Sequence, residues 1–195
     1  GLWIIQCCKR QWDNETRLSW DEVAQMAEAA PAFQSFIDVN DPVFYDGDSM
    51  PEKIQAYCAK TGQKVPQTKG EIARTVYESL AMSYRDAFLG LEQLKQCRIE
   101  VLNIVGGGSK NRFLNQLTAN VLDREVVAGP SEATAIGNIM AQAKASGAVK
   151  DSAEMAEVIR SSFGVESYAP RDTEQAMQAY ERYTRIMESQ KGSDK

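Results

Sequence analysis

The sequence contains no histidine among its 195 residues. This absence excludes Ser-His-Asp and Cys-His nucleophilic sites, because both need an imidazole to take the proton of the nucleophile. It also excludes the HExxH zinc motif, in which two histidines hold the metal. Any acid–base step by an imidazole is likewise excluded.

Cysteine is scarce as well. Cys7 and Cys8 are adjacent, so on a helix their side chains would point in different directions. No C-x-x-C pair occurs among the four cysteines, which are Cys7, Cys8, Cys58 and Cys97. These observations favour buried, reduced cysteines over a disulfide framework or a metal site.

The sequence also lacks a basic block and an apolar run of transmembrane length. Its formal net charge of −5 argues against a general nucleic-acid binder or an anionic-membrane binder. The apolar residues 2–5 are too few to span a bilayer and lack the charged flank of a signal peptide. With 43% hydrophobic and 25% charged residues, the composition is typical of a globular domain. We therefore expect a cytoplasmic protein with no nucleic-acid and no membrane partner.

What is present is organised around one stretch, residues 100–130. Residues 101–105 are apolar and partly β-branched, which predicts a short buried strand. Three consecutive glycines follow, and after them Ser109 is a good N-cap residue for the helix that the next apolar spacing predicts. Residues 125–128 predict a second strand. A strand, a turn without side chains and a helix N-terminus together let a ligand approach the backbone.

The glycine turn by itself does not identify a ligand. No Gly-Lys-Ser/Thr closes it into a P-loop, and Asn111 stands where a G-x-G-x-x-G fingerprint has its last glycine. On local evidence the turn is equally a tight strand-to-helix connection that needs positive φ. Both interpretations stay open at this level.

The other segments predict helices more than strands. Capping boxes at Ser19, Ser49 and Thr68 mark helix starts, and Ser131 is expected to cap a helix whose Gly137 allows close backbone packing near the glycine turn. The helix after Thr68 is the longest, and its apolar stripe predicts direct packing against the strand at residues 101–105.

The fold class that follows is α/β, mostly helical, with too few strands for a free-standing sheet. The aspartate-rich residues 31–50 lack EF-hand spacing and predict an acidic surface loop rather than a cation site. A helix is expected over residues 1–12, and residues 189–195 are expected to form a disordered tail.

A longer stretch of the sequence narrows the range of possible functions. The sequence GGGSKNRFLNQLTANVLDREVV, followed by EATAIGN at residues 132–138, resembles the C-terminal domain of the FGGY family of carbohydrate kinases. Residues 1–6 and the stretches 71–74 and 78–81 agree, in the family's order. Within the family, the resemblance is strongest to members that act on L-rhamnulose.

This resemblance implies an actin-like, ribonuclease-H-like ATPase domain that phosphorylates a sugar. Family members are more than twice this length, so residues 1–188 would be the C-terminal portion of the second kinase domain, on the nucleotide side. The catalytic aspartate and the phosphate loops would then precede Gly1. We therefore assign no catalytic residue and no metal ligand, and expect this chain alone to be inactive. Its unpaired strand edge predicts self-association.

The resemblance also implies the cofactors, ATP and Mg²⁺, and a nucleotide site. Gly106 and Gly107 would lie against the nucleotide, and Ser109 and Asn111 would offer polar groups to its adenosine part. Gln6 would lie close to the nucleotide, although by itself this residue favours a solvated helical glutamine.

Two acidic residues near the expected nucleotide site have structural roles that explain their presence. Asp123 is expected to end a helix, and Glu132 is expected to serve a helix N-terminus.

Two other functions remain open from the residues. One is a helical binding module that acts through exposed apolar faces without nucleotide affinity. The other is a fragment of a nicotinamide-nucleotide oxidoreductase with a Rossmann-like turn. Asn111 and the lack of an acidic residue at the end of a second strand count against the oxidoreductase.

Overall fold

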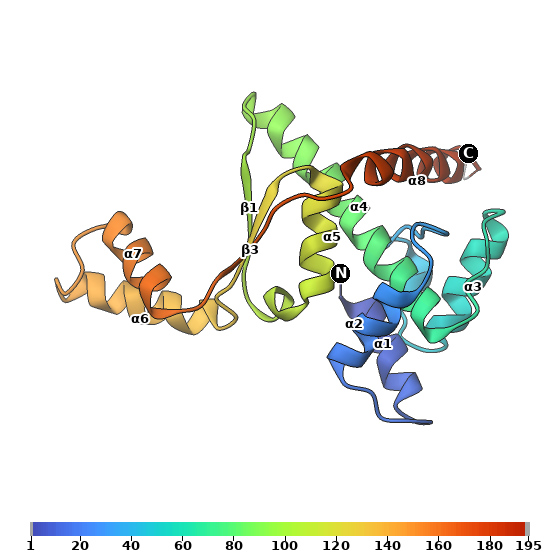
Figure 1. Ribbon diagram of the computed structural model, residues 1–195, viewed down its shortest axis with the longest axis horizontal. Helices are drawn as coiled ribbons and strands as arrows, with labels where there is room; N and C mark the ends of the chain where they lie inside the picture. Colours follow the sequence, from blue (N-terminus) through green and yellow to red (C-terminus); the bar gives the residue numbers. More distant parts are fainter. Residues whose placement is uncertain (1, 194–195) are drawn as a thin grey trace.

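The computed structural model describes residues 2–193 and is a mostly helical α/β protein, as the sequence predicts (Figure 1). In chain order its elements are α1 (Trp3–Trp12), α2 (Trp20–Ala29), the 3₁₀ helix η1 (Pro42–Phe44), α3 (Met50–Lys60), α4 (Lys69–Lys95), β1 (Val101–Ile104), the 3₁₀ helix η2 (Gly107–Lys110), α5 (Arg112–Leu122), β2 (Glu125–Ala128), α6 (Ala133–Ala145), α7 (Ser152–Ser162), β3 (Glu166–Tyr168) and α8 (Thr173–Ser193).

The three strands form one sheet in the order β1-β2-β3. β1 and β2 are parallel, with Leu102 beside Val126, and β3 runs antiparallel to β2. The chain crosses from β1 to β2 through α5, as a parallel pair requires. α5 packs on β2 and β3 and covers one face of the sheet, where Val126 and Ala128 are buried. Val101 and Asn103 lie on the opposite face and are exposed.

The longest helix, α4, begins as the sequence predicts. The Thr68 side chain accepts a hydrogen bond from the Glu71 amide at 3.1 Å, and the Glu71 side chain accepts one from the Thr68 amide at 3.0 Å. This capping box satisfies two backbone donors at the helix start. The predicted stripe forms part of the core, with buried Ile72, Val76, Leu80 and Phe88.

The expectation that α4 packs directly against β1 is wrong. α4 packs mainly along α2 and α5, and α5 contacts both α4 and β2, so α5 separates α4 from the sheet. The contact with α2 is close, because a Cβ added at Gly70 would lie 2.5 Å from the Met26 carbonyl oxygen.

α6 and α7 form a hairpin that projects from the rest of the molecule, on the side of the sheet away from α5 (Figure 1). The hairpin has a small apolar cluster of its own, made of Ile136, Met140 and Val149. Gly137 does not serve the close packing that was expected, because it is exposed and a Cβ added there would meet no atom within 4 Å.

Two expected helix caps are not formed. Ser49 adopts a left-handed backbone (φ 49°, ψ 41°) and its side chain makes no cap hydrogen bond, because an N-cap residue needs an extended backbone to reach the helix amides. Ser131 lies one residue too early, since α6 begins at Ala133 with Glu132 in the cap position. The Glu132 side chain makes no cap hydrogen bond either.

Other expectations are corrected at the chain ends and at one cysteine. Cys97 is exposed, whereas Cys7, Cys8 and Cys58 are buried as predicted. Helix α8 continues to Ser193 where a tail was expected from Ser189, because no proline interrupts the helix there. Residues 194 and 195, and Gly1 at the expected start of the first helix, lie outside the described residues.

The aspartates of the loop before α3 take part in local turns. Asp38 accepts a hydrogen bond from the Asn40 amide, and Asp41 accepts one from the Val43 amide, both at 2.9 Å. Such bonds are the usual way in which aspartate stabilises turns.

Candidate functional site

The glycine turn lies at the carboxyl end of β1, where ligands of parallel α/β sheets usually bind. Its first glycine, Gly106, has φ 78° and ψ −162°, a conformation that is essentially restricted to glycine. The Gly106 amide donates to the Pro130 carbonyl at 3.1 Å, which ties the turn to the end of β2. The Ser109 amide and hydroxyl both donate to the Gly106 carbonyl, at 3.0 and 2.7 Å. The turn is therefore held rigidly on both sides.

Gly107 differs from Gly106 in a way that the sequence did not predict. The positive φ expected of the turn is found at Gly106, whereas Gly107 begins η2 without a positive φ. A Cβ added at Gly107 would meet no atom within 4 Å, and the residue is exposed. Neither the backbone nor the packing of the described chain therefore demands a glycine at this position.

Asn111, rather than Ser109, caps α5. Its Oδ1 accepts a hydrogen bond from the Leu114 amide at 2.9 Å, because the helix begins at Arg112, later than predicted. The Ser109 hydroxyl closes the preceding 3₁₀ turn instead. Both side chains still lie at the N-terminal end of α5, where the helix dipole favours negative charge.

Asn115 supports the turn from inside the protein, a role that sequence reasoning missed. It is fully buried and its Nδ2 donates to the Ser109 carbonyl at 2.8 Å. Its position on the inward face of α5 is the signal that could have indicated a buried amide.

Tyr77 of α4 packs behind the same turn. Its ring lies edge-on to Phe113, with 5.8 Å between the ring centroids. The side chain is fully buried, and burial raises its pKa to about 12. Tyr77 is therefore a neutral packing residue.

Gln6 comes from a different element. It is exposed on α1, one turn after Leu2, whose Cδ1 would lie 3.7 Å from a Cβ added at Gly108. The structure thus brings the start of α1 to the glycine turn, but it records no contact between the Gln6 side chain and that turn.

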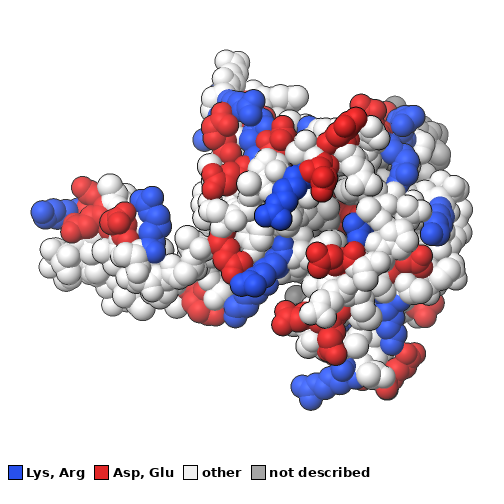
Figure 2. All heavy atoms as spheres, in the orientation of Figure 1, with Lys and Arg blue, Asp and Glu red and all other residues white. Residues whose placement is uncertain are grey.

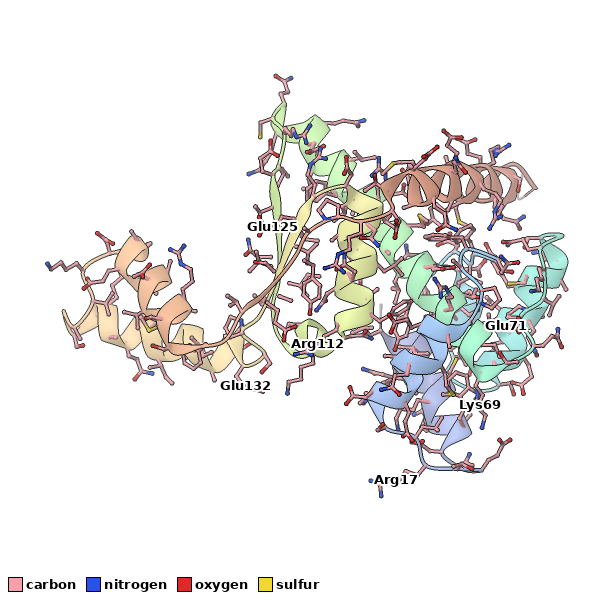
Figure 3. The ribbon with its side chains drawn as sticks, viewed as in Figure 1. Arg17, Lys69, Glu71, Arg112, Glu125 and Glu132 are labelled. Atoms are coloured by element: carbon pink, nitrogen blue, oxygen red, sulfur yellow. The ribbon has the colours of Figure 1, made fainter. Side chains whose placement is uncertain are left out.

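A groove of about 290 Å³ adjoins the turn. Arg112 and Glu166 form an ion pair across it, from the start of α5 and the start of β3. The hydrogen bonds from Tyr168 and from Arg112 lower the pKa of Glu166. Figure 3 shows Arg112 and Glu132 at the same end of the sheet, whereas Glu125 lies at the other end. The groove is lined by Ser109, Lys110, Arg112, Ala128, Gly129, Ser131, Gly164 and Glu166.

The donor set of this region suits a nucleotide better than a protein-held metal. Hydroxyl, amide and cationic groups surround exposed backbone, and Asp123 lies at the far end of α5 as its C-cap, as predicted. Among the described residues, no group of three or more His, Cys, Asp or Glu side chains could hold a metal ion.

Acidic and basic side chains are interspersed on the face shown in Figure 2. None of the helices in residues 2–193 combines the length and the apolar character needed to cross a membrane.

Comparison with known proteins identifies the family. Residues 1–146 match the model of the C-terminal domain of the FGGY family of carbohydrate kinases. The chain therefore belongs to this family.

Curated relatives include several proteins named rhamnulokinase. The one from Enterococcus faecalis is 45% identical over 86% of this chain and 34% of its own length. Those from Bacillus subtilis and Bacteroides thetaiotaomicron are each 41% identical, over 90% and 88% of this chain. The chain spans only 36% and 35% of the lengths of these last two relatives.

Solved structures of sugar kinases share the fold. The xylulose kinase from Rhodospirillum rubrum superposes with a TM-score of 0.67 at 18% identity, over 97% of this chain and 38% of that one. The gluconate kinase from Lactobacillus acidophilus gives 0.55 at 19% identity, over 92% and 37%. Family membership and this likeness together place the chain in the actin-like ATPase fold, as the resemblance implied.

Proposed function

We propose that this chain supplies the nucleotide side of an ATP-dependent sugar kinase whose substrate is L-rhamnulose and which works in the cytoplasm. Family membership supports sugar phosphorylation. The names of the relatives that share 41–45% identity support rhamnulose as the sugar. The solved xylulose and gluconate kinases are more distant, at 18–19% identity, and support only the fold.

The observation that carries the nucleotide assignment is the freedom of Gly107. It is exposed, has an ordinary φ and has open space where a Cβ would lie. Gly90 of α4 has the same freedom, so what supports a ligand at Gly107 is this freedom together with its place at the carboxyl end of β1, where the backbone can lie against a ligand.

The neighbouring groups suit the adenosine part of ATP. Ser109 uses its hydroxyl proton on the Gly106 carbonyl, so its oxygen lone pairs remain for a ligand donor. Asn111 uses Oδ1 to cap α5 and its side chain also interacts with the Tyr77 hydroxyl, so of the two Nδ2 protons one remains for a ligand acceptor. The N-terminal end of α5 favours an electronegative group.

Phosphoryl transfer asks for positioning and charge neutralisation more than for covalent chemistry from the protein. Mg²⁺ would supply charge neutralisation while bound to the nucleotide phosphates. We assign to this chain the binding and orientation of the nucleotide, and no catalytic base.

The proposal is tested by titrating the chain with Mg-ATP and following backbone amides by two-dimensional NMR, which detects weak binding. We expect the amides of Gly106, Gly107 and Asn111 to shift. Gly107→Val should abolish these shifts, because a branched side chain would occupy the ligand's space. Gly90→Val is the matched control, since Gly90 also has open space around its Cβ position and an ordinary φ.

Folding is checked by circular dichroism for both variants. A folded Gly107→Val chain whose amides still shift as in the parent would refute the site and leave a simple turn.

The same titration distinguishes the two alternative functions. Shifts with NAD but none with ATP would favour the oxidoreductase, and no shift with either would favour a binding module. Family membership and the rhamnulokinase relatives favour the kinase over both.

A further inference from the structure

Asn115 connects the glycine turn to β3 through a chain of side-chain contacts. Its Nδ2 donates to the Ser109 carbonyl at 2.8 Å, and the same side chain interacts with the Tyr168 hydroxyl. That hydroxyl donates to Glu166 at 2.5 Å. Because a hydroxyl has one proton and Tyr168 uses it on Glu166, Tyr168 can only accept a hydrogen bond from Asn115. The two Nδ2 protons of Asn115 therefore have two acceptors, one in the turn and one in β3.

The burial of Asn115 is costly for a polar side chain. The residue is fully buried, and its Oδ1 has no hydrogen-bond partner among residues 2–193. A buried oxygen without a partner lowers stability, so a polar residue at such a place needs a reason other than stability. The contacts of the Nδ2 group give that reason, because they fix the position of a carbonyl in the turn.

The carbonyl that Asn115 holds lies between the groups that we assign to the nucleotide. Its peptide unit joins Ser109 to Lys110, one residue before Asn111. A displacement of this unit would move the Ser109 hydroxyl and the Asn111 side chain relative to Gly107. Groups that bind a ligand keep their geometry only when buried hydrogen bonds behind them hold it.

We propose that Asn115 is a positioning residue for nucleotide binding, which holds the Ser109 carbonyl so that the turn fits ATP, and that the Tyr168 hydroxyl keeps Asn115 in this orientation. The inference rests on the proposed nucleotide site. Glu166 completes the chain of contacts at the groove, where it also pairs with Arg112. Through Asn115, β3 thus acts on the nucleotide from behind the turn.

NMR titration of the 195-residue chain with Mg-ATP tests the proposal in Asn115→Ala. We expect the dissociation constant to rise about fivefold to tenfold, because the Ser109 carbonyl loses its buried donor. A second readout needs no nucleotide. The Lys110 amide belongs to the same peptide unit as the Ser109 carbonyl, so its resonance should move in the free variant. Circular dichroism checks that the variant is folded.

Thr118→Ala is the matched control. Thr118 is also fully buried on α5, but its hydroxyl donates to the Leu114 carbonyl within the helix, at 2.7 Å. This variant should lower stability while the ATP affinity and the Lys110 resonance stay as in the parent. Tyr168→Phe removes only a hydroxyl, from a partly exposed side chain. It should therefore fold, and it should move the Lys110 resonance in the same direction as Asn115→Ala.

The outcomes separate this inference from the proposed function. A parent chain that does not bind ATP would refute both. If the parent binds ATP and Asn115→Ala binds it as tightly, only the positioning role is refuted. Thr118→Ala weakening ATP binding as much as Asn115→Ala would also refute that role, because loss of helix stability would then be sufficient. An unchanged Lys110 resonance in Tyr168→Phe would overturn the part assigned to Tyr168.

Discussion

The adjacent residues Gly106 and Gly107 are glycines for different physical reasons, and substitutions at the two positions can distinguish these reasons. Gly106 has φ 78° and ψ −162°, so Gly106→Ala should cost about 1 to 3 kcal/mol of unfolding free energy. Gly107 has open space and no positive φ, so Gly107→Ala should change stability by about 0.5 kcal/mol or less. Urea unfolding of both variants measures the difference, and equal losses would contradict the structural distinction.

Glu78 is a buried acid that links three segments. It is 1% exposed on α4, pairs with Arg74 at 2.7 Å and accepts from the Phe33 amide at 2.8 Å. Arg182 of α8 donates to the Phe33 carbonyl. Burial, which outweighs the Arg74 and Phe33 bonds, raises the Glu78 pKa to about 7.

This raised pKa predicts a pH dependence of stability. Because the folded state holds the Glu78 proton more tightly than the unfolded state, this stabilisation is complete below a pH of about 4.5 and is lost as the pH rises through about 7. Glu78→Gln mimics the protonated form, so its stability should fall less over this range. Urea unfolding at several pH values compares the two, and parallel profiles would refute the raised pKa.

Single residues differed in how well the sequence predicted them. The glycine turn and the buried Cys7, Cys8 and Cys58 could be predicted, because composition and local pattern determine them. The exposure of Cys97 and the burial of Glu78 depend on which face of a helix or turn meets another element, which a single sequence does not encode locally.

At the scale of the element, a capping-box sequence formed its hydrogen bonds only where the backbone of the N-cap residue was extended. The boxes at Ser19 and Thr68 form on extended N-cap residues. The same pattern at Ser49 fails, because that residue is left-handed. Helix α5 starts after a 3₁₀ turn, so its N-cap residue is Asn111 and not Ser109, the residue expected from the sequence. Turn geometry, which the residue types alone did not determine, decided these outcomes.

Asn111 has two roles that substitutions can separate. Asn111→Ala removes the cap of α5 and should cost about 1 kcal/mol of stability. Asn111→Asp keeps an oxygen for the Leu114 amide and should retain that stability. It also replaces the carboxamide donor with a negative charge, so it should weaken ATP binding.

Urea unfolding reports the cap, and the NMR titration reports binding. If Asn111→Asp binds ATP as tightly as the parent, Asn111 acts only as a helix cap.

At the scale of the whole molecule, β1, β2 and the helix between them could be predicted, but β3 and the packing of the elements could not. The βαβ unit follows from periodicity and turn residues. The placement of α5 between α4 and the sheet, and the projection of α6 and α7, depend on contacts between distant segments. The family resemblance supplied the fold that local patterns could not.

The last prediction is that this chain alone does not phosphorylate L-rhamnulose. A kinase needs a base for the sugar hydroxyl and groups that hold the phosphates, and the chain spans about a third of its relatives, 34–36%. Glu166, the acid in the groove, has a lowered pKa because Tyr168 and Arg112 stabilise its charge, which makes it a weak base. ADP release should therefore match that of a mock purification, whereas sugar-dependent release above this background, lost in Glu166→Gln, would refute the prediction and identify Glu166 as the base.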